Sequence, residues 1–541
     1  MANVSATMDG SATADVSPSE LRKVVFASSL GTVFEWYDFY LYATLAPFFA
    51  ALFFPPGNDT AALLSAFATY AAGFLVRPFG AVVFGRVGDI VGRKYTFLVT
   101  ILLMGFSTFA TGLLPTYETI GVLAPILLVT LRLLQGLALG GEYGGAATYV
   151  AEYSPAKSRG LSTAWIQTTA TLGFFLALLV IGLCRFYFPD ADFKNWGWRI
   201  PFLISLILLV FSIYIRLKLN ESPVFQKMKS EGKASKSPLY DSFFRYPNNR
   251  YVLLALLGAT AGQGVVWYTG QFYALFFLTL YLKLDYLTAY TMIGSALLIG
   301  TPFFLFFGWL SDKIGRLKII LAGCLIAAVT YFPLFGELSR AVNPALSEFQ
   351  DKHPITVQID KSTCGFHIFT TAFTKFSDCD KARDLLTKAG MSFVTQEAAP
   401  GAPITMTIGS GAPITGFDAK KWNDALLGAG YPAKVDYSQI DYTKAMIILV
   451  IMLIYVTMVY GPIAAFLVEL FPTNIRYTSM SLPYHIGNGW FGGMLPLLAT
   501  AIVAATGNIY AGLWYPIIVA AMTVVIGTLF LRDHKARSFE T

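Results

Sequence analysis

A chain of 541 residues that is 55% hydrophobic and only 13% charged is too apolar for an ordinary soluble protein. Its formal net charge of +7 does not indicate nucleic-acid binding, because the basic residues lie in short segments between apolar runs. The four cysteines and four histidines show no metal-ligand spacing, and no nucleophile–base pair suggests an enzyme. We therefore expect a membrane protein that has no metal or cofactor of its own.

Apolar runs of about 20 residues, the length that crosses a bilayer, recur along the chain. Twelve membrane helices are predicted, near 24–50, 61–84, 95–114, 122–150, 161–187, 199–219, 251–281, 287–310, 319–338, 444–468, 478–503 and 508–531. We predict an all-α membrane protein of two pseudo-symmetric six-helix halves. The predicted units are a tail (1–20), the first half (21–219), a linker (220–250), helices 7–9 (251–343), an α+β insert (344–443), helices 10–12 (444–532) and a second tail (533–541).

The Lys and Arg content of the short loops predicts the orientation of these helices. Basic residues gather at 86–94, 157–159 and 216–250, and again at 313–318, whereas the alternate loops such as 115–121 contain none. The tail before the first helix lacks the apolar core of a signal peptide. We expect both termini and the linker on the cytoplasmic side.

Two short motifs occur once in each predicted half, which indicates an internal repeat. GRVGDIVGR at 85–93 returns as GWLSDKIGR at 308–316, a separation of 223 residues (308 − 85). The pattern E-x-x-P-x-x-x-R at 152–159 returns at 469–476, a separation of 317 residues (469 − 152). The 94-residue difference indicates an insertion between the two motifs of the second half. Repeated halves are typical of transporters.

The polar segment 344–443 is the insertion, and it joins a helix that leaves the cytoplasm to one that returns. We expect it outside, as a small domain with strands at PITVQID, SFVTQ and PITMTIG and helices at SDCDKARDLLTKAG and FDAKKWNDALLGAG. Cys364 and Cys379 share this segment, so an oxidising compartment would allow a disulfide. The insert could shape substrate entry or receive a periplasmic partner; a tolerated insertion without a transport role is the alternative.

The repeated G-x-x-x-D-x-x-G-R motif predicts an inner gate. Its glycines let helices approach closely, while the carboxylate and guanidinium can pair in one conformational state and separate in another. The gating residues are Gly85, Asp89, Gly92 and Arg93 in the first copy, and Gly308, Asp312, Gly315 and Arg316 in the second. The alternative is that these charges only set the topology.

Charges inside the predicted helices indicate a polar path, because a central charge costs at least about 2.5–3.5 kcal/mol. Glu35 and Asp38 lie on one face of the first helix, with Tyr42 one turn beyond Asp38. A buried carboxyl pair can bind and release a proton; permanent pairing with arginines is the alternative. Arg132 in the fourth helix suits a carboxylate, either an acid of the first helix or a substrate.

We assign proton coupling to Glu35, Asp38, Arg132 and Glu142. The candidate substrate-binding residues are Tyr42, Arg77, Arg132, Gln135, Gln167, Gln263, Trp267, Tyr268, Gln271, His485 and Asn488. Arg77 could instead extend to the inner loop, and His485 is either a proton relay or a hydrogen-bonded packing residue. The glycines after Gln135 are explained by tight packing against another helix.

Several of these segments are similar to a known family. The repeated gate motif resembles the loop signature of the major facilitator superfamily. EWYDFYLY (35–42), GFLVRPFG (73–80), RLLQGLALGGEYGGAATYVAEYSP (132–155) and WGWRIPF (196–202) resemble its metabolite:proton symporters, which include α-ketoglutarate, shikimate, citrate and proline/betaine permeases. The resemblance covers the chain outside about 344–443. It implies a multi-pass protein of the bacterial inner membrane that uses the proton-motive force by alternating access.

Two rival transport mechanisms find no support in the sequence. The helix at 161–187 lacks the glycine–proline signature that resembles antiporters, and no P-loop for ATP occurs. We predict a proton-coupled symporter that imports a small carboxylate-bearing metabolite, such as α-ketoglutarate, citrate or a shikimate-like acid. The alternatives are a proline/betaine-type osmolyte:proton symporter and a nutrient receptor with a transporter fold. The expected partners are substrate, proton and lipid bilayer, without nucleic acid.

Overall fold

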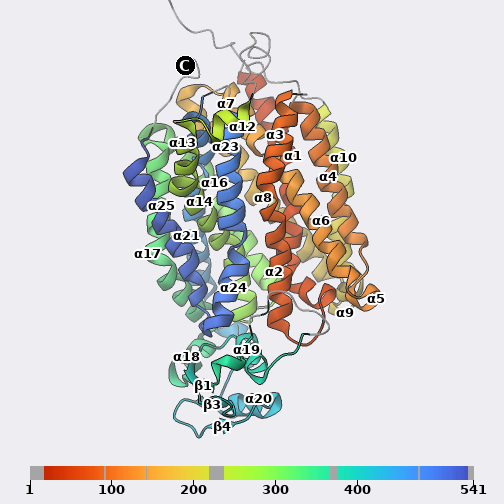
Figure 1. Ribbon diagram of the computed structural model, residues 1–541, viewed down its shortest axis with the longest axis vertical. Coiled ribbons are helices and arrows are strands. Elements are labelled where there is room, and N and C mark those ends of the chain that lie inside the picture. The colour runs from red at the N-terminus through yellow and green to blue at the C-terminus, as the bar shows by residue number, and fades with distance from the viewer. Residues whose placement is uncertain are drawn as a thin grey trace, which may run out of the picture.

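The computed structural model describes residues 18–90, 93–141, 143–217, 237–365, 367, 374–472 and 475–533. A long helical bundle carries a smaller α+β unit at one end (Figure 1). We call the end of the bundle that carries the α+β unit the insert-side end, and the opposite end the distal end.

The first half of the bundle appears in red to yellow in Figure 1. Its helices are α1 (Pro18–Phe53), α2 (Asp59–Leu75), α3 (Arg77–Ile90), α4 (Arg93–Leu113), α5 (Tyr117–Ile120), α6 (Leu123–Gly140), α7 (Tyr143–Tyr153), α8 (Arg159–Tyr187), α9 (Asp190–Asn195) and α10 (Ile200–Leu217). The predicted helix at 61–84 is interrupted at Val76, just before Arg77 and Pro78. Proline in the first turn of a helix costs no hydrogen bond, so α3 can start there.

The second half appears in green to blue. Its helices are α12 (Pro238–Phe243), α13 (Asn248–Ala255), α14 (Ala261–Tyr268), α15 (Ala274–Phe276), α16 (Tyr286–Ile314), α17 (Arg316–Val342), α21 (Tyr442–Tyr460), α22 (Ile463–Leu470), α23 (Arg476–His485), α24 (Leu495–Thr506) and α25 (Trp514–Phe530). π-Helical turns at Leu256–Thr260, Thr269–Tyr273 and Phe277–Tyr281 interrupt the span from α13 onward, and Ile486–Gly493 (η8) separates α23 from α24. Such turns are frequent at functional sites.

Ten helical segments among the described residues are long and apolar enough to cross a membrane. They are Asp59–Phe84, Leu123–Gly140, Ala156–Tyr187, Gly197–Ile215, Asn248–Tyr281, Tyr286–Ile314, Arg316–Val342, Tyr442–Leu470, Arg476–Thr506 and Ala511–Phe530. The 36-residue α1 and the apolar stretch Leu98–Leu113 of α4 run in the same bundle.

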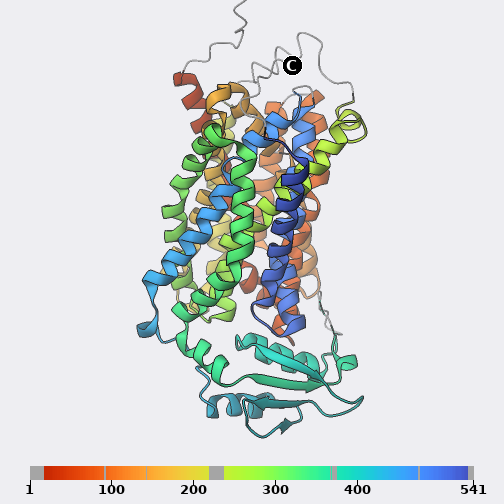
Figure 2. The same ribbon diagram turned by 90° about the vertical axis from the view of Figure 1, so that its left-hand side faces the viewer.

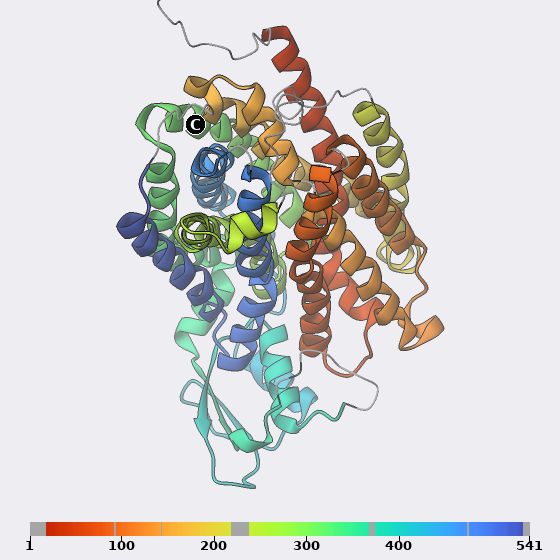
Figure 3. The ribbon, with the colours of Figure 1, turned by 45° about the horizontal axis from the view of Figure 1, so that its top comes forward.

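The halves meet along two seams, and Figure 3, tilted so that the distal end comes forward, shows the two halves side by side. On one seam α8 packs along α16; on the other α2 packs against η8 and α24. Close approach on the first seam requires glycine: a side chain at Gly308 would meet Cβ of Ala164 at 2.5 Å. The backbone oxygen of Gly160 would lie 2.8 Å from the same side chain, so the backbones of α8 and α16 approach closely on this seam, as small residues allow.

The insert follows α17 and precedes α21 (Figure 2). It contains α18 (Pro344–Lys352), β1 (Ile355–Ile359), α19 (Asp378–Lys388), β2 (Phe393–Glu397), β3 (Thr405–Ile408), β4 (Ile414–Thr415) and α20 (Ala419–Gly428). The sheet order is β2-β1-β3-β4, with β1 parallel to β2 and antiparallel to β3. It has a hydrophobic core of its own, to which Val357, Leu386 and Trp422 contribute fully buried side chains.

Candidate substrate site and gate

Arg132 occupies the middle of α6 and its side chain is buried. Its Nη1 donates to Oε1 of Gln135 at 2.8 Å and to the backbone oxygen of Phe39 at 3.3 Å. The guanidinium lies 3.9 Å from the centre of the Phe39 ring, with Tyr42 and Tyr70 at 4.9 and 4.8 Å. Arg132 is therefore held by an amide, a carbonyl and aromatic faces, which are attractive but uncharged partners.

Arg77, at the start of α3, lies against the same aromatic ring. Its guanidinium is 4.3 Å from the Phe39 ring centre and 4.0 Å from that of Phe74, and the side chain is 1% exposed. In the described part of the chain, Nε and Nη2 of Arg77 and of Arg132 have no hydrogen-bond partner. The possibility that Arg77 extends to the inner loop does not fit this buried position.

Glycines bring the two arginines together. A side chain at Gly136 would meet the backbone oxygen of Gly73 at 1.8 Å, and one at Gly140 would meet that of Arg77 at 2.1 Å. The α6 backbone therefore lies directly against α2 and α3, as the small residues of the fourth predicted helix indicated. This close approach places the guanidinium groups of Arg77 on α3 and Arg132 on α6 against the same Phe39 ring.

Glu35 and Asp38 are buried in α1, with exposures of 4% and 5%. Among the described residues, Oδ1 of Asp38 has no hydrogen-bond partner and no ion pair joins Asp38 to Arg132. In this conformation Arg132 is bonded to Gln135 instead. Alternation of Arg132 between Asp38 and a substrate remains a prediction. Tyr42 presents its ring to Arg132, while its hydroxyl donates to the backbone oxygen of Ala66 at 3.1 Å.

The second half contributes polar groups from α14, α23, η8 and the π-helical turn η4 (Thr269–Tyr273). Gln263 and Asn488 bond each other reciprocally, at 3.0 and 2.8 Å, and so bind α14 to η8. Within the described chain, the Gln271 amide and the Trp267 indole nitrogen lack hydrogen-bond partners although both residues are buried. Both ring nitrogens of His485 also lack partners there, and its role as a proton relay or a packing residue stays a prediction.

An aromatic contact links the halves beside this site. The Tyr268 ring of α14 lies 5.5 Å from Phe74 of α2. The Gln167 amide donates to the Tyr143 hydroxyl at 2.5 Å, and the Tyr143 ring stacks on Tyr484 at 3.5 Å. The sequence analysis missed Tyr143 and Tyr484. Their polar-aromatic surroundings, GEYGG and PYHIG, were the available signal.

The distal end closes on buried ion pairs. Glu469 accepts from Arg159 at 3.0 Å and from Nε and Nη2 of Arg316, both at 2.9 Å. Arg159 belongs to the first half and Glu469 and Arg316 to the second, so one carboxylate joins the halves. The side chains of all three are at most 3% exposed.

Asp312 makes a second connection between the halves. It pairs with Arg316 at 2.8 Å and accepts from the backbone nitrogens of Gly160 and Leu161 at 2.8 and 3.0 Å. Asp312 thereby binds the N-terminus of α8, where unpaired N–H groups and the helix dipole favour a carboxylate. Gly315 forms the following turn at φ 112°, and a side chain there would meet Asp533.

The second repeat motif supplies the ion pairs that cross between the halves at the distal end. Arg159 of the first copy pairs with Glu469 of the second, and Arg476 lies 3.8 Å from Glu152 in the reverse sense. The sequence analysis recognised the repeat but did not place these residues in the gate. Of the other predicted residues, Gly92 and Glu142 lie outside the described part of the structure, and for Gly85, Asp89 and Arg93 only the backbone is described.

Cys364 and Cys379 are joined by a disulfide in the insert, with Cα atoms 5.2 Å apart. Cys184 and Cys324 are free and buried. The described residues contain no group of three or more His, Cys, Asp or Glu side chains that could hold a metal.

Comparison with known proteins identifies the class. A family model described as sugar (and other) transporter matches residues 23–241, and one described as MFS/sugar transport protein matches 145–341. An Escherichia coli K12 protein named inner membrane metabolite transport protein YhjE is 31% identical over 95% of this chain and 94% of its own. The E. coli shikimate transporter is 35% identical over 60% of this chain and 74% of its own. A putative proline/betaine transporter of Staphylococcus haemolyticus is 39% identical over 56% and 64%.

A solved structure of the E. coli xylose transporter XylE in a partially occluded inward-open conformation shares the fold, with a TM-score of 0.62 at 14% identity over 96% of this chain and 100% of that chain. The protein belongs to the major facilitator superfamily. It is a multi-pass membrane transporter and not an enzyme.

Proposed function

We propose that the protein is a proton-coupled symporter that imports a small carboxylate-bearing metabolite by alternating access. In this proposal α1 and α4 complete twelve membrane spans. The distal end and both termini face the cytoplasm, and the insert lies in the periplasm of a bacterial inner membrane. The buried ion pairs around Glu469 then form the closed inner gate.

The observation that carries this proposal is the pair of buried, unsatisfied arginines. A cation removed from water without an anionic partner is costly, and such a charge in a transporter usually faces the ligand. Arg77 and Arg132 each retain two nitrogens without acceptors in the described region, over one shared aromatic ring. A substrate with one or two carboxylates would supply those acceptors, and the planar guanidinium fork binds a carboxylate through two bonds.

Asp38 is the proposed coupling acid. It is buried on α1, one turn from Tyr42, whose ring faces Arg132. When Asp38 is ionised it can attract Arg132; when it is protonated it leaves Arg132 available to the substrate. Proton and anion would then bind with mutual assistance, which is the linkage that a symporter requires.

Reconstituted protein tests the proposal directly. We expect proteoliposomes with an inward proton gradient to accumulate at least one of α-ketoglutarate, citrate or shikimate, and a protonophore to abolish accumulation. Gradient-independent equilibration would contradict the proton coupling, and transport of none of the organic acids would contradict the substrate class.

A zwitterionic osmolyte is the second candidate, because two relatives named as putative proline/betaine transporters are each 39% identical over more than half of this chain. An arginine would bind its carboxylate and the Tyr and Trp rings its cation. The same assay with proline and betaine separates the two. A ligand-induced thermal shift without any uptake would instead favour the receptor alternative.

A further inference from the structure

The insert is joined firmly to the second half of the transporter. Asn343, between α17 and α18, donates to the backbone oxygen of Leu282 at 3.1 Å. At the edge of the sheet, the backbone nitrogen of Phe393 donates to the backbone oxygen of Gly507 at 2.8 Å. Ser392 also accepts from the backbone nitrogen of Ile509 at 3.3 Å. The insert therefore bonds the loops before α16 and after α24.

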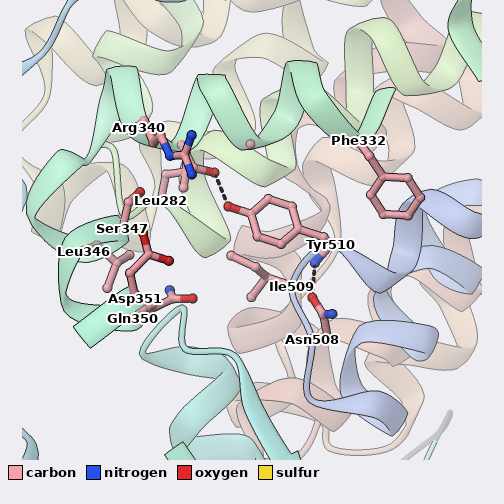
Figure 4. Close-up of a pocket in the computed structure, with 12 residues that line it drawn as sticks. Leu282, Phe332, Arg340, Leu346, Ser347, Gln350, Asp351, Asn508, Ile509 and Tyr510 are labelled. Carbon is pink, nitrogen blue, oxygen red and sulfur yellow. Dashed lines mark hydrogen bonds between the residues drawn. The ribbon is translucent and has the colours of Figure 1, made fainter. Parts of the chain in front are cut away.

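Figure 4 shows the same junction from the side of α18. A cavity of about 390 Å³ lies between α17, α18 and the loop after α24, and the Tyr510 hydroxyl donates to Ser339 at 2.8 Å beside it. Tyr437, on the chain that leaves the insert, donates to Asp285 at 2.8 Å. With bonds distributed around the junction, the insert should move with the second half as one body.

One helix of the insert also reaches the first half. Oδ1 of Asp384 on α19 accepts from the backbone nitrogen of Thr60, in the first turn of α2, at 2.7 Å. Lys388, one turn further along α19, pairs with Asp59. Phe376, just before α19, packs against Gly57, where a side chain would lie 3.3 Å from its ring. A carboxylate at a helix N-terminus is well placed electrostatically, so Asp384 is a favourable partner for α2.

The end of α19 lies at the seam between the halves. Lys283, in the loop before α16, donates to the backbone oxygen of Lys388. Gly390 follows at φ 69°, and a side chain there would meet the backbone oxygen of Tyr281 at 2.2 Å. The segment 384–390 therefore contacts α2 of one half and the α16 side of the other.

The internal structure of the insert makes α19 a stiff element. Ser377 and Asp380 form a reciprocal capping box at its start, and the Cys364–Cys379 disulfide ties its first turn to the loop after β1. Leu386 is fully buried in the core of the insert. A displacement of the second half would accordingly be transmitted to Asp384 and Lys388.

The path between the halves is closed near this contact. Phe67 of α2 packs on Phe276 of α15 at 4.8 Å, and both side chains are buried. Arg185 at the end of α8 lies 4.5 Å from the ring centre of Tyr286 on α16. Opening at the insert-side end must separate these pairs, and it must also draw α2 away from α19.

We propose that the insert is an outer latch: it is fixed to the second half and holds the N-terminus of α2 through Asp384 and Lys388, so that outward opening requires release of α19. This inference rests on the alternating-access cycle proposed above. It assigns the insert a role in the cycle that requires neither substrate nor an additional partner protein.

The test measures how often the insert-side end opens. Phe67→Cys serves as the reporter in the full chain, with Cys184 and Cys324 replaced by alanine, and a membrane-impermeant maleimide is added from the insert side. The native disulfide does not react. We expect Asp384→Ala to raise the labelling rate about 3- to 10-fold and Lys388→Asp to raise it less, because the pair with Asp59 is exposed.

Two further variants decide the interpretation. Asp59→Lys combined with Lys388→Asp should return the labelling rate toward that of the parent. Asp378→Ala, which removes an exposed carboxylate paired with Lys381 on the same helix, should leave the rate unchanged. Equal labelling of the Asp384→Ala and Asp378→Ala variants would overturn the latch. Labelling needs no substrate or proton gradient, so the two proposals can fail independently. The latch can be wrong although the protein accumulates substrate, and the latch can be right although proton-driven uptake is not observed.

Discussion

Two buried clusters of charge in this transporter are satisfied in opposite ways. At the distal end, Glu469 accepts from Arg159 and Arg316, so each cation meets an anion. In the centre, Arg77 and Arg132 lie on aromatic rings, with nitrogens that have no acceptor in the described structure. Both clusters are almost completely buried, so exposure to solvent does not explain the difference.

The difference supports the proposal that the distal cluster holds a conformation and that the central cluster binds the substrate. Paired charges that bridge two bodies stabilise the state in which they meet, and must part for the distal end to open. Unpaired buried charges cost free energy until something binds them, so they favour the bound state. Substitutions in the two clusters should therefore change stability and ligand binding in different ways.

Arg132→Gln should produce the largest effect on ligand binding. Loss of a buried charge partner typically costs about 2–5 kcal/mol, so we expect affinity for the carboxylate substrate to fall by roughly 100-fold or more. The ligand-free variant should melt at a higher temperature than the parent, because an unpaired cation has been removed. Thermal-shift titration measures both quantities. Arg340→Gln, at an exposed arginine paired with Glu337, is the control; a lower melting point for Arg132→Gln would show that Arg132 is a structural residue.

Asp38→Asn should abolish accumulation of substrate against its gradient while some counterflow persists, since the coupling proton has lost its acceptor. Glu35→Gln should do so less completely. Uphill uptake and counterflow are measured in the same proteoliposomes. Continued concentration of substrate by Asp38→Asn under an imposed pH gradient would exclude Asp38 as the coupling residue.

Glu469→Gln should destabilise the ligand-free protein, the opposite of Arg132→Gln. Removing one member of a buried ion pair costs about 3–5 kcal/mol, and here two arginines lose the same anion. The melting temperature should fall, and cysteines placed at the distal end should become more accessible. Glu337→Gln, at an exposed glutamate near the other end of α17, should change neither. An unchanged melting temperature in Glu469→Gln would show that the ion pairs of Glu469 do not stabilise this conformation.

Asp312→Asn should have a smaller effect that concerns turnover more than binding. The variant weakens the bond to the N-terminus of α8 and to Arg316 but leaves the central site intact. We expect the transport rate to fall about tenfold at nearly constant substrate affinity. Coupling free energies between sites in proteins with two conformational states are typically about 1–3 kcal/mol, and a tenfold change lies within that range. Asp89→Asn in the first copy should behave similarly. Unchanged rates in both would leave these residues a topological role.

The smallest effect concerns Lys283, at the insert-side end. Burial, together with the nearby Lys388 ammonium, lowers the pKa of Lys283 to about 8. An unfolded lysine titrates near 10.4, so between about pH 8 and 10 the unfolded chain binds more protons and stability rises with pH, by at most about 1.4 kcal/mol per unit. We expect Lys283→Gln to flatten this part of the melting profile, and Lys361→Gln, at an exposed lysine, to retain it. Identical profiles for parent and Lys283→Gln would contradict the lowered pKa.

The sequence by itself determined the class of molecule. Apolar runs of membrane length, basic loops on alternate sides and motifs repeated in each half predicted a helical transporter, and comparison placed the chain in the superfamily that the motifs resemble. The patterns in 344–443 likewise correspond to α19, β1 and the other elements of the insert. Periodicity and composition carry this information because burial in lipid or in a small core constrains every residue of an element.

The tertiary structure alone decided which charges are paired. Arg132 and Arg316 are both buried arginines, and nothing in their local sequence states that Arg316 meets Glu469 while Arg132 meets Gln135. The partner of Arg159 lies 310 residues away, and α19 meets α2 across more than 320 residues. Such contacts depend on how the two halves and the insert pack against one another. That packing is set by the close approach of backbones at glycines and by the relative positions of distant segments. A hydropathy pattern contains no information about either.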